Sequence, residues 1–347
     1  MDPPKLFPIL RLPFVPLQEI FKAMDPFEII NFSMISKRTK AVTKQMTFYS
    51  KYSIQIEVDE ELELRILGPK YMTQCLYIFT IDEEMNGQVS ENKRIDGKIE
   101  KRVSHYFEDP VNEWKQLCKH VLEIFKKETI DVLSMTMDAF ADQNISIIDF
   151  LKTIVKSVND CDLFHSEEEN DVDEHATYLL DNLKVNDELN SYVDIKSDNF
   201  DGKIPKNLKE LLIKNSQWIE YERLLEIDCK SVILEYNLIS DKEWNLFFKK
   251  WIAMETNQNL EHLELDYIEI GEFRDHVLHD IPHEMVDEGV KRVMKTRRNR
   301  TQEITESRGN ATQEISGGID IKRIDGKTAT FFVYREYSTN RFAMSIH

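Results

Sequence analysis

The chain has 347 residues, of which 41% are hydrophobic and 10% aromatic. This length suits about two domains, and the apolar fraction excludes a chain that is mainly disordered. Acidic residues outnumber basic ones by 63 to 45, which gives a formal net charge of −18. Such a surface repels phosphate, so wholesale binding of nucleic acid or anionic membrane is excluded.

Charge is distributed unevenly along the chain. Residues 1–50 hold seven basic and four acidic residues, whereas residues 160–201 hold fourteen acidic residues and two lysines. The asymmetry indicates two surfaces with different partners, or an acidic loop that only keeps the protein in solution.

Features that would mark a secreted or membrane protein are missing from the sequence. The four cysteines stand more than forty residues apart, which is typical of buried thiols in a reducing compartment. The first residues lack the basic start and cleavage site of a signal peptide, and no run of eighteen apolar residues occurs. We therefore expect a cytoplasmic and/or nuclear protein.

Residues 1–48 predict three short helices. Behind Pro16, an apolar stripe at helical spacing predicts the first helix: Leu17, Ile20, Phe21 and Met24. Asp25 and Pro26 end it and start a second helix to Ile35, with Glu28 placed for a capping box. A third helix follows Ser36. The second helix is apolar nearly all round, and so small a unit cannot bury both of its faces, so one face should need a partner or the rest of the chain.

This opening segment resembles an F-box over roughly residues 7–46. The resemblance lies in the Leu12-Pro13 pair, the amphipathic helix, the Asp25-Pro26 break, the apolar helix and the Ser36-Lys37-Arg38 start of the third helix. The tryptophan usual late in the motif is absent, and Ala41-Val42 stand in its place.

From residue 52 the apolar period changes to two. Strands are predicted at 53–58, 62–67 and 75–81, a hairpin turn at Asp96-Gly97, and an amphipathic helix at 110–126. Strands and helices then alternate, which favours a parallel sheet. We expect strands near 131–140, 191–196, 208–213, 231–236 and 260–268, with helices at 146–158 and 241–254.

Two strand segments, 207–213 and 259–265, resemble those of leucine-rich repeats at about twice the usual spacing of 20–29 residues. Ordinary βαβ units explain the pattern equally well, so both architectures stay open. Residues 291–318 are polar and are predicted to form a flexible loop. A terminal hairpin is predicted with strands at 319–324, 329–334 and 342–346 and a turn at Asp325-Gly326.

The later part of the chain resembles the F-box-associated domain, type 2, found behind many nematode F-boxes. The resemblance lies in residues 208–265, most clearly in 241–252, and in the tail 317–329. The fold class we expect is α/β overall: a three-helix F-box-like module at 1–48, connecting strands and a helix at 49–130, and an α/β recognition domain at 131–347.

The resemblance implies a substrate-receptor subunit of a Skp-cullin-F-box ubiquitin ligase, which marks proteins for degradation. The F-box would dock on a Skp-type linker and, through it, on a cullin, and the C-terminal domain would hold an unknown protein substrate. By position, the linker contacts would be Leu12, Pro13, Leu17, Ile20, Pro26, Ile29 and Ile30. The alternatives are a helical subdomain packed on the α/β body and an interaction scaffold unconnected with ubiquitin.

Catalytic motifs are absent from the sequence. No phosphate-binding glycine loop and no nucleophile elbow occurs, so we expect no enzyme, no cofactor and no catalytic residue. His276, His279 and His283 would share one face of a helix and could bind zinc, but Pro282 would distort that helix. We therefore expect no metal site.

The substrate site should lie away from residues 1–48, because an adaptor holds its partners on separate surfaces. The acidic stretch Glu167–Glu174 and the basic stretch Lys291–Arg300 are the candidates, and the latter could also be an import signal or a charged helix end. We expect partner binding to map to residues 190–347 and to weaken with salt.

Overall fold

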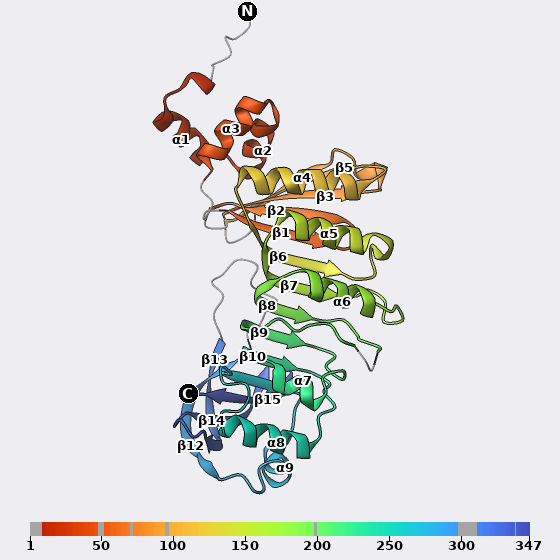
Figure 1. The fold of residues 1–347 in the computed structure, drawn as a ribbon. Coiled ribbons are helices and arrows are strands. Elements are labelled where there is room, and N and C mark those ends of the chain that lie inside the picture. The colour runs from red at the N-terminus through yellow and green to blue at the C-terminus, as the bar shows by residue number, and fades with distance from the viewer. Residues whose placement is uncertain are drawn as a thin grey trace, which may run out of the picture. The chain divides into compact units, whose positions relative to one another are not determined.

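A computed structural model describes residues 9–47, 52–69, 72–93, 97–197, 200–297, 311–336 and 338–347 (Figure 1). Contacts within the chain divide it into two compact units, Met1–Asn159 and Asp160–His347. The domain boundaries expected from the sequence, after residues 48 and 130, stay a prediction.

The first unit begins with a short 3₁₀ turn, η1 (Ile9–Arg11), and three helices: α1 (Phe14–Ala23), α2 (Pro26–Met34) and α3 (Lys37–Met46). The capping box of α2 is present, because the Glu28 N–H donates to Asp25 Oδ1 and the Asp25 N–H donates to Glu28 Oε2, each at 2.9 Å. Ser36 caps α3 through Thr39 in the same way. The three predicted helices are confirmed, although α1 begins two residues before Pro16.

A mixed sheet follows in the first unit, with the strand order β4-β5-β3-β2-β1-β6. Its strands are β1 (Ser53–Val58), β2 (Leu62–Leu67), β3 (Thr73–Thr80), β4 (Val89–Lys93), β5 (Ile99–Tyr106) and β6 (Thr129–Thr136), and η4 (Glu83–Met85) precedes β4. β1–β2, β2–β3 and β4–β5 are antiparallel, whereas β3–β5 and β1–β6 are parallel. Of the predicted turn, Asp96 lies outside the described residues, and Gly97 has the positive φ of +83°.

Two helices complete this unit: α4 (Pro110–Ile124) and, after η5 (Ala141–Gln143), α5 (Asn144–Ile154). The apolar side of α4 packs on β2 and β3, and the Trp114 indole N–H donates to the Glu63 carbonyl at 3.4 Å. Trp114, Cys118 and Val121 are fully buried there, as the period of the sequence predicts.

β7 (Ser157–Phe164) begins in the first unit and ends in the second. The second unit then alternates helices and strands: α6 (Asp173–Asn182), β8 (Val185–Ser191), β9 (Leu208–Ile213), α7 (Tyr221–Glu226), β10 (Cys229–Leu234), α8 (Asp241–Ile252), β11 (His262–Leu265) and α9 (Ile270–His276). β8, β9, β10 and β11 are parallel, which confirms the predicted parallel sheet. The residues paired across these four strands are Leu189, Leu211, Val232 and Leu263. The sequence separations from Leu189 to Leu211 and from Leu211 to Val232 fall within the 20–29 residues of leucine-rich repeats.

The acidic stretch 160–201 is not the single loop that its composition indicates. It contains the end of β7, all of α6 and all of β8, and the strand predicted at 191–196 instead occupies Val185–Ser191. The acidic and amide side chains of these elements interrupt the apolar alternation. Only a few apolar positions, such as Leu179 and Leu189, are left to mark the buried face.

The prediction of a flexible loop at 291–318 is wrong for the residues that the structure describes. Here β12 (His283–Thr296) and β13 (Ala311–Lys322) pair antiparallel, followed by β14 (Thr328–Glu336) and β15 (Thr339–Ile346), which confirm the predicted terminal strands. The pairing shifts register between Val286 and Lys291. Opposite this shift, Gly318 has φ +126°, and a Cβ there would stand 2.7 Å from the Phe331 carbonyl oxygen.

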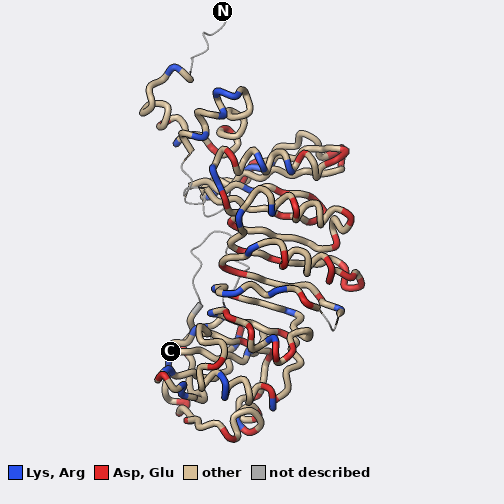
Figure 2. The backbone as a smooth tube through the Cα atoms, in the orientation of Figure 1, with Lys and Arg blue, Asp and Glu red and all other residues tan. Residues whose placement is uncertain are grey.

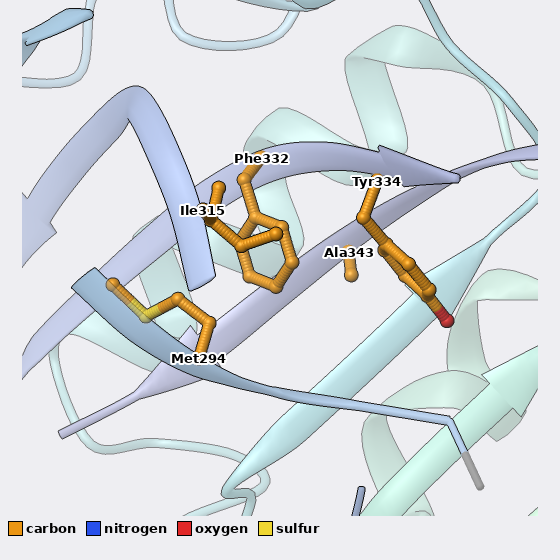
Figure 3. Packing of buried hydrophobic residues seen from close by; sticks show 5 residues of the cluster. All are labelled: Met294, Ile315, Phe332, Tyr334 and Ala343. Carbon is orange, nitrogen blue, oxygen red and sulfur yellow. The ribbon is translucent and has the colours of Figure 1, made fainter. Parts of the chain in front are cut away.

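The polarity of β12 and β13 hides a small buried cluster. Met294 and Ile315, one from each strand, pack with Phe332, Tyr334 and Ala343 of β14 and β15 (Figure 3). Around them, the Arg292 guanidinium forms a two-bond ion pair with Asp320, at 2.9 and 3.0 Å. Together with Ile319 and Ile321 of β13, which are fully buried, these contacts hold a hairpin whose remaining side chains are mostly polar.

On the other side of this sheet, α8 and α9 supply an aromatic core. Trp244, Phe247, Phe248 and Trp251 are buried, as the helix pattern predicts. The ring of Phe248 stands 5.0 Å from that of Phe331, and the ring of Phe273 stands 4.6 Å from that of Phe342. Along the backbone of each unit, lysines and arginines are interspersed with aspartates and glutamates (Figure 2).

Candidate protein-docking site on the N-terminal helices

One face of the N-terminal helices is buried within the first unit. Ile29 and Ile30 are fully buried, and Leu17 and Phe21 nearly so. The Phe21 ring meets that of Phe32 edge to face at 5.6 Å, and the Phe27 ring meets that of Tyr77 on β3 at 4.7 Å. This apolar contact attaches the helices to the adjoining sheet.

Polar contacts fix the same attachment. Lys101 Nζ of β5 stands 2.6 Å from Asp25 Oδ2, so the residue that caps α2 also pairs with the sheet. The Thr47 hydroxyl donates to the Ile124 carbonyl at 2.7 Å. Ser33 Oγ lies 2.6 Å from the Ile30 carbonyl and 2.7 Å from His120 Nε2. Because the hydroxyl has one proton and donates it to the carbonyl, the imidazole Nε2–H is the donor to Ser33.

Electrostatics follow these contacts. The hydrogen bond to Asp25 raises the pKa of Lys101. Lys40 and Lys44 of α3 both pair with Glu123 of α4, and the hydrogen bond from Lys40 lowers the pKa of that carboxyl. Burial lowers the pKa of His120, and the nearby Lys40 lowers it further. The seam between α3 and α4 therefore keeps His120 neutral at pH 7.

Large apolar side chains are exposed at the ends of two of these helices. Phe14 and Val15 at the start of α1, Met34 at the end of α2 and Ile35 just after it are 53–73% exposed. We call these four residues the exposed apolar set. Large apolar side chains gathered on one small module are typical of a protein-interaction surface.

The seven predicted linker contacts divide according to their burial. Pro13 is exposed, and Leu12 and Ile20 are half-buried, whereas Leu17, Pro26, Ile29 and Ile30 are buried within the chain. The seven stay a prediction as a set, and the buried four reach a partner only if the helices move away from the sheet. The exposed apolar set was missed, although the rule that one small module cannot bury both faces of α2 pointed to Met34.

The three histidines weighed as zinc ligands do not share a helical face. His276 ends α9, His279 lies in the following turn, and His283 begins β12. The Nδ1 atoms of His279 and His283 lie within hydrogen-bond distance of the carbonyl oxygens of His276 and Ile281. No group of three possible metal ligands occurs among the described residues.

The four cysteines are buried and free, as expected. Burial raises the pKa of the Cys75 and Cys229 thiols to about 12, so both stay protonated and unreactive at neutral pH.

The two charged stretches proposed for substrate binding have different surroundings. Glu167–Glu174 covers the turn before α6 and its first residues, and it is largely exposed. In the basic stretch, Lys291 and Arg292 pair with Glu314 and Asp320, and the positions from 298 to 300 lie outside the described residues. Lys295 and Arg297 pair with Glu261 and Glu235, so the described cations of that stretch already have acidic partners within the second unit.

Comparison with known protein families matches two parts of the chain. The model described as "F-box domain" matches residues 9–51, which are the helices above, and the model described as "F-box associated" matches residues 199–265. The chain carries an F-box followed by an F-box-associated region. This order confirms the resemblance found in the sequence. The second match spans β9, α7, β10, α8 and β11.

Two curated proteins of Caenorhabditis elegans are similar to this chain. The "Skn-1 dependent zygotic transcript 15 protein" is 22% identical over an alignment covering 93% of each chain. The "Uncharacterized protein F59B2.9" is 25% identical over 140 residues, which cover 40% of this chain and 30% of that protein. No solved structure gives a significant match.

F-box and F-box-associated domains together indicate a substrate adaptor of Skp-cullin-F-box ubiquitin ligases. F-box domains generally bind a Skp-type linker and thereby a cullin, and proteins of these families are typically adaptors without enzymatic activity. Among the helices that the structure describes, none is long and apolar enough to cross a membrane.

Proposed function

We propose that this protein is the substrate receptor of a Skp-cullin-F-box ubiquitin ligase. In this role the N-terminal helices bind a Skp-type linker, and the second unit holds a protein to be ubiquitylated. The protein contributes proximity and no chemical group, since the ligase supplies the transfer chemistry. The observation that carries the proposal is the exposed apolar set on a module that matches the F-box.

The division of the apolar residues into buried and exposed ones supports a docking role. The buried side of the helices already contacts Tyr77, His120 and Lys101, so the exposed apolar set is what remains for a partner. Burying Phe14, Val15, Met34 and Ile35 against a partner would remove four large apolar side chains from water, each worth about 1.5–3 kcal/mol when fully buried. The same four residues have no evident role in holding the first unit together.

A scaffold unconnected with ubiquitin is the rival function. It would use the same soluble fold and the same absence of catalytic motifs, but it would not require capture of a Skp-type linker. The two functions are therefore separated by one binding measurement.

The test is capture of a purified Skp-type linker by the full-length protein, followed by calorimetry. Ile35→Asp should weaken binding at least tenfold, because a charge would be buried in an apolar contact. Ile81→Asp is the matched control, since Ile81 is 74% exposed in the same unit and Ile35 is 73% exposed. It should leave linker affinity within twofold of the parent value.

Failure of the unmodified protein to bind any Skp-type linker would support the scaffold. Equal weakening by both substitutions would place the contact away from the exposed apolar set. Circular dichroism of each variant checks that the substitution itself does not unfold the first unit.

A further inference from the structure

A second group of exposed apolar side chains lies in the second unit, where the parallel strands β9, β10 and β11 end. Tyr236 and Leu238 follow β10, and Tyr267 follows β11; all three are more than half exposed. Leu234 pairs with Leu265 in the parallel ladder, so Tyr236 and Tyr267 occupy corresponding places just past it. Carboxyl ends of parallel strands are the usual position of binding sites in α/β folds.

Hydrogen bonds hold these strand-end loops to one another. The Tyr236 N–H donates to Asp266 Oδ2 at 2.5 Å, which ties the loop after β10 to the loop after β11. The Ser216 N–H and hydroxyl both donate to the Glu235 carbonyl, at 3.0 and 2.8 Å, which ties in the loop after β9. The exposed tyrosines are therefore presented by a fixed platform and not by independent loops.

One of the five left-handed non-glycine residues among the described residues lies in the same place. Tyr236 has φ +54°, a left-handed conformation that is unusual for a bulky residue. Holding a non-glycine residue there costs on the order of 1–2 kcal/mol, and such strain clusters at functional sites. The Asp266 carboxylate compensates by accepting the amide proton of Tyr236.

Carboxylates are frequent in the segments that carry the apolar group. These segments, residues 214–220, 235–241 and 266–272, are the loops after β9, β10 and β11 with the first residues of α8 and α9, and Lys214 is their single basic residue. Glu220, Asp241, Glu269 and Glu272 are exposed there. Glu235 is not part of this free charge, because Arg297 and Arg341 both pair with it. A ligand for this surface must place positive charge beside an apolar side chain.

We propose that the strand-end surface, made by Tyr236, Leu238 and Tyr267 with the surrounding carboxylates, binds a protein segment in which lysine or arginine lies close to a large apolar residue. Tyrosine and leucine supply apolar contact, and the carboxylates select the basic flank and speed encounter. Within the proposed receptor function, this surface is where the substrate segment docks. That the bound segment belongs to a substrate rests on the proposed function, whereas the preference for a basic and apolar segment does not.

The test uses full-length protein and a random peptide library displayed on phage. Enriched peptides should carry Lys or Arg within a few positions of a large apolar residue. The best of them is then synthesised and its Kd measured. Leu238→Ala, Tyr236→Ala and Tyr267→Ala should each raise Kd about tenfold. Ile324→Ala is the matched control, since Ile324 is 71% exposed and Leu238 is 72% exposed.

Charge is tested separately with the pair Glu220→Lys and Glu272→Lys, which should weaken the same peptide at least tenfold at low salt. No enrichment, acidic peptides, or equal affinity of the Leu238→Ala and Ile324→Ala variants would overturn the proposal. The same preparations are assayed for linker capture. Lost linker capture with intact peptide binding would remove the ligase function and leave the strand-end surface standing, and the reverse outcome would do the opposite.

Discussion

The exposed apolar set of the N-terminal helices and the strand-end surface of the second unit both expose large apolar side chains but differ in the charged residues beside them. The first consists of residues at the ends of two helices, next to the exposed cations Lys37 and Arg38 of α3. The second places two tyrosines and a leucine on loops surrounded by carboxylates. Opposite charge beside similar apolar area means that a partner suited to one surface is repelled by the other.

The two surfaces also have different supports. The N-terminal helices depend on side-chain contacts with the sheet of the first unit, through Phe27 and Asp25, and with α4, through Ser33. The strand-end loops extend from a parallel ladder and are tied together by backbone amides. Substitutions can therefore break one surface and spare the other, which makes the comparison testable.

The largest expected effect concerns the contrast between buried and exposed apolar residues of the N-terminal helices. Ile30→Ala should lower the free energy of unfolding by about 2–5 kcal/mol, because it leaves a cavity at a fully buried position. Ile35→Ala, at an exposed position, should change it by less than about 0.5 kcal/mol. Urea denaturation measures both.

The two substitutions should have the reverse order of effect on linker affinity, measured where both variants are folded. Ile35→Ala should weaken linker binding more than Ile30→Ala does. If Ile30→Ala had the greater effect on affinity under folded conditions, the partner would bind the inner face, and the predicted contacts Ile29 and Ile30 would stand.

The next effect in size concerns the hairpin of β12 and β13. Gly318→Ala should destabilise the protein by about 2 kcal/mol or more, because the added Cβ meets the Phe331 carbonyl at 2.7 Å and φ is +126°. Gly326→Ala is the control, since its φ is also positive but no atom lies within 4 Å of the added Cβ, and about 1 kcal/mol is expected. Thermal unfolding distinguishes the two. Equal losses would mean that the hairpin has room to shift.

The N-terminal helices could be predicted almost to the residue because their signals are local. Asp25, Pro26 and Glu28 define a helix start within four residues, and Ser36 defines the next. Burial of α2 was less predictable, since both of its faces are apolar and only the position of Tyr77 and His120, far along the chain, decides which is covered.

β12 and the first half of β13 could not be predicted, for the converse reason. These segments have little intrinsic apolar alternation, and their stability comes from partners distant in sequence, such as Met294 against Phe332. The strand-end surface was equally hidden. The sequence around Tyr236 and Tyr267 does not show whether these side chains are exposed or buried. That they lie at corresponding positions follows only from the register of β10 and β11.

A smaller effect concerns pH and the seam between α3 and α4. The pKa of His120 is lowered in the folded protein, by burial first and by Lys40 second, so the unfolded chain takes up the proton more readily. Stability from this group is therefore present above about pH 6.5 and is lost as the pH falls below it. His120→Gln should reduce the drop in Tm between pH 7.5 and pH 5.5.

The remaining pH dependence should come partly from His105, whose pKa burial also lowers. The double variant His105→Gln/His120→Gln should therefore show a smaller drop than either single variant. A drop of unchanged size in His120→Gln would mean that the folded protein takes up the proton on His120 without cost.

The smallest expected effect is at Tyr236 of the strand-end surface, where one substitution should raise stability and lower peptide affinity. Tyr236 holds a left-handed backbone, which asparagine adopts more easily than tyrosine. Its side chain is exposed, so Tyr236→Asn removes strain without leaving a cavity and should stabilise the protein by about 0.5–1 kcal/mol. The same substitution removes an aromatic anchor, and peptide affinity should fall.

The control is Leu238→Asn, on the same loop. Ordinary surface substitutions of this kind change stability by no more than about 0.5 kcal/mol in either direction. A gain in stability together with a loss of binding would show that the strain at Tyr236 is retained for recognition. A loss of both would mean that the tyrosine side chain itself supports the loop, and the conformation would then need no functional explanation.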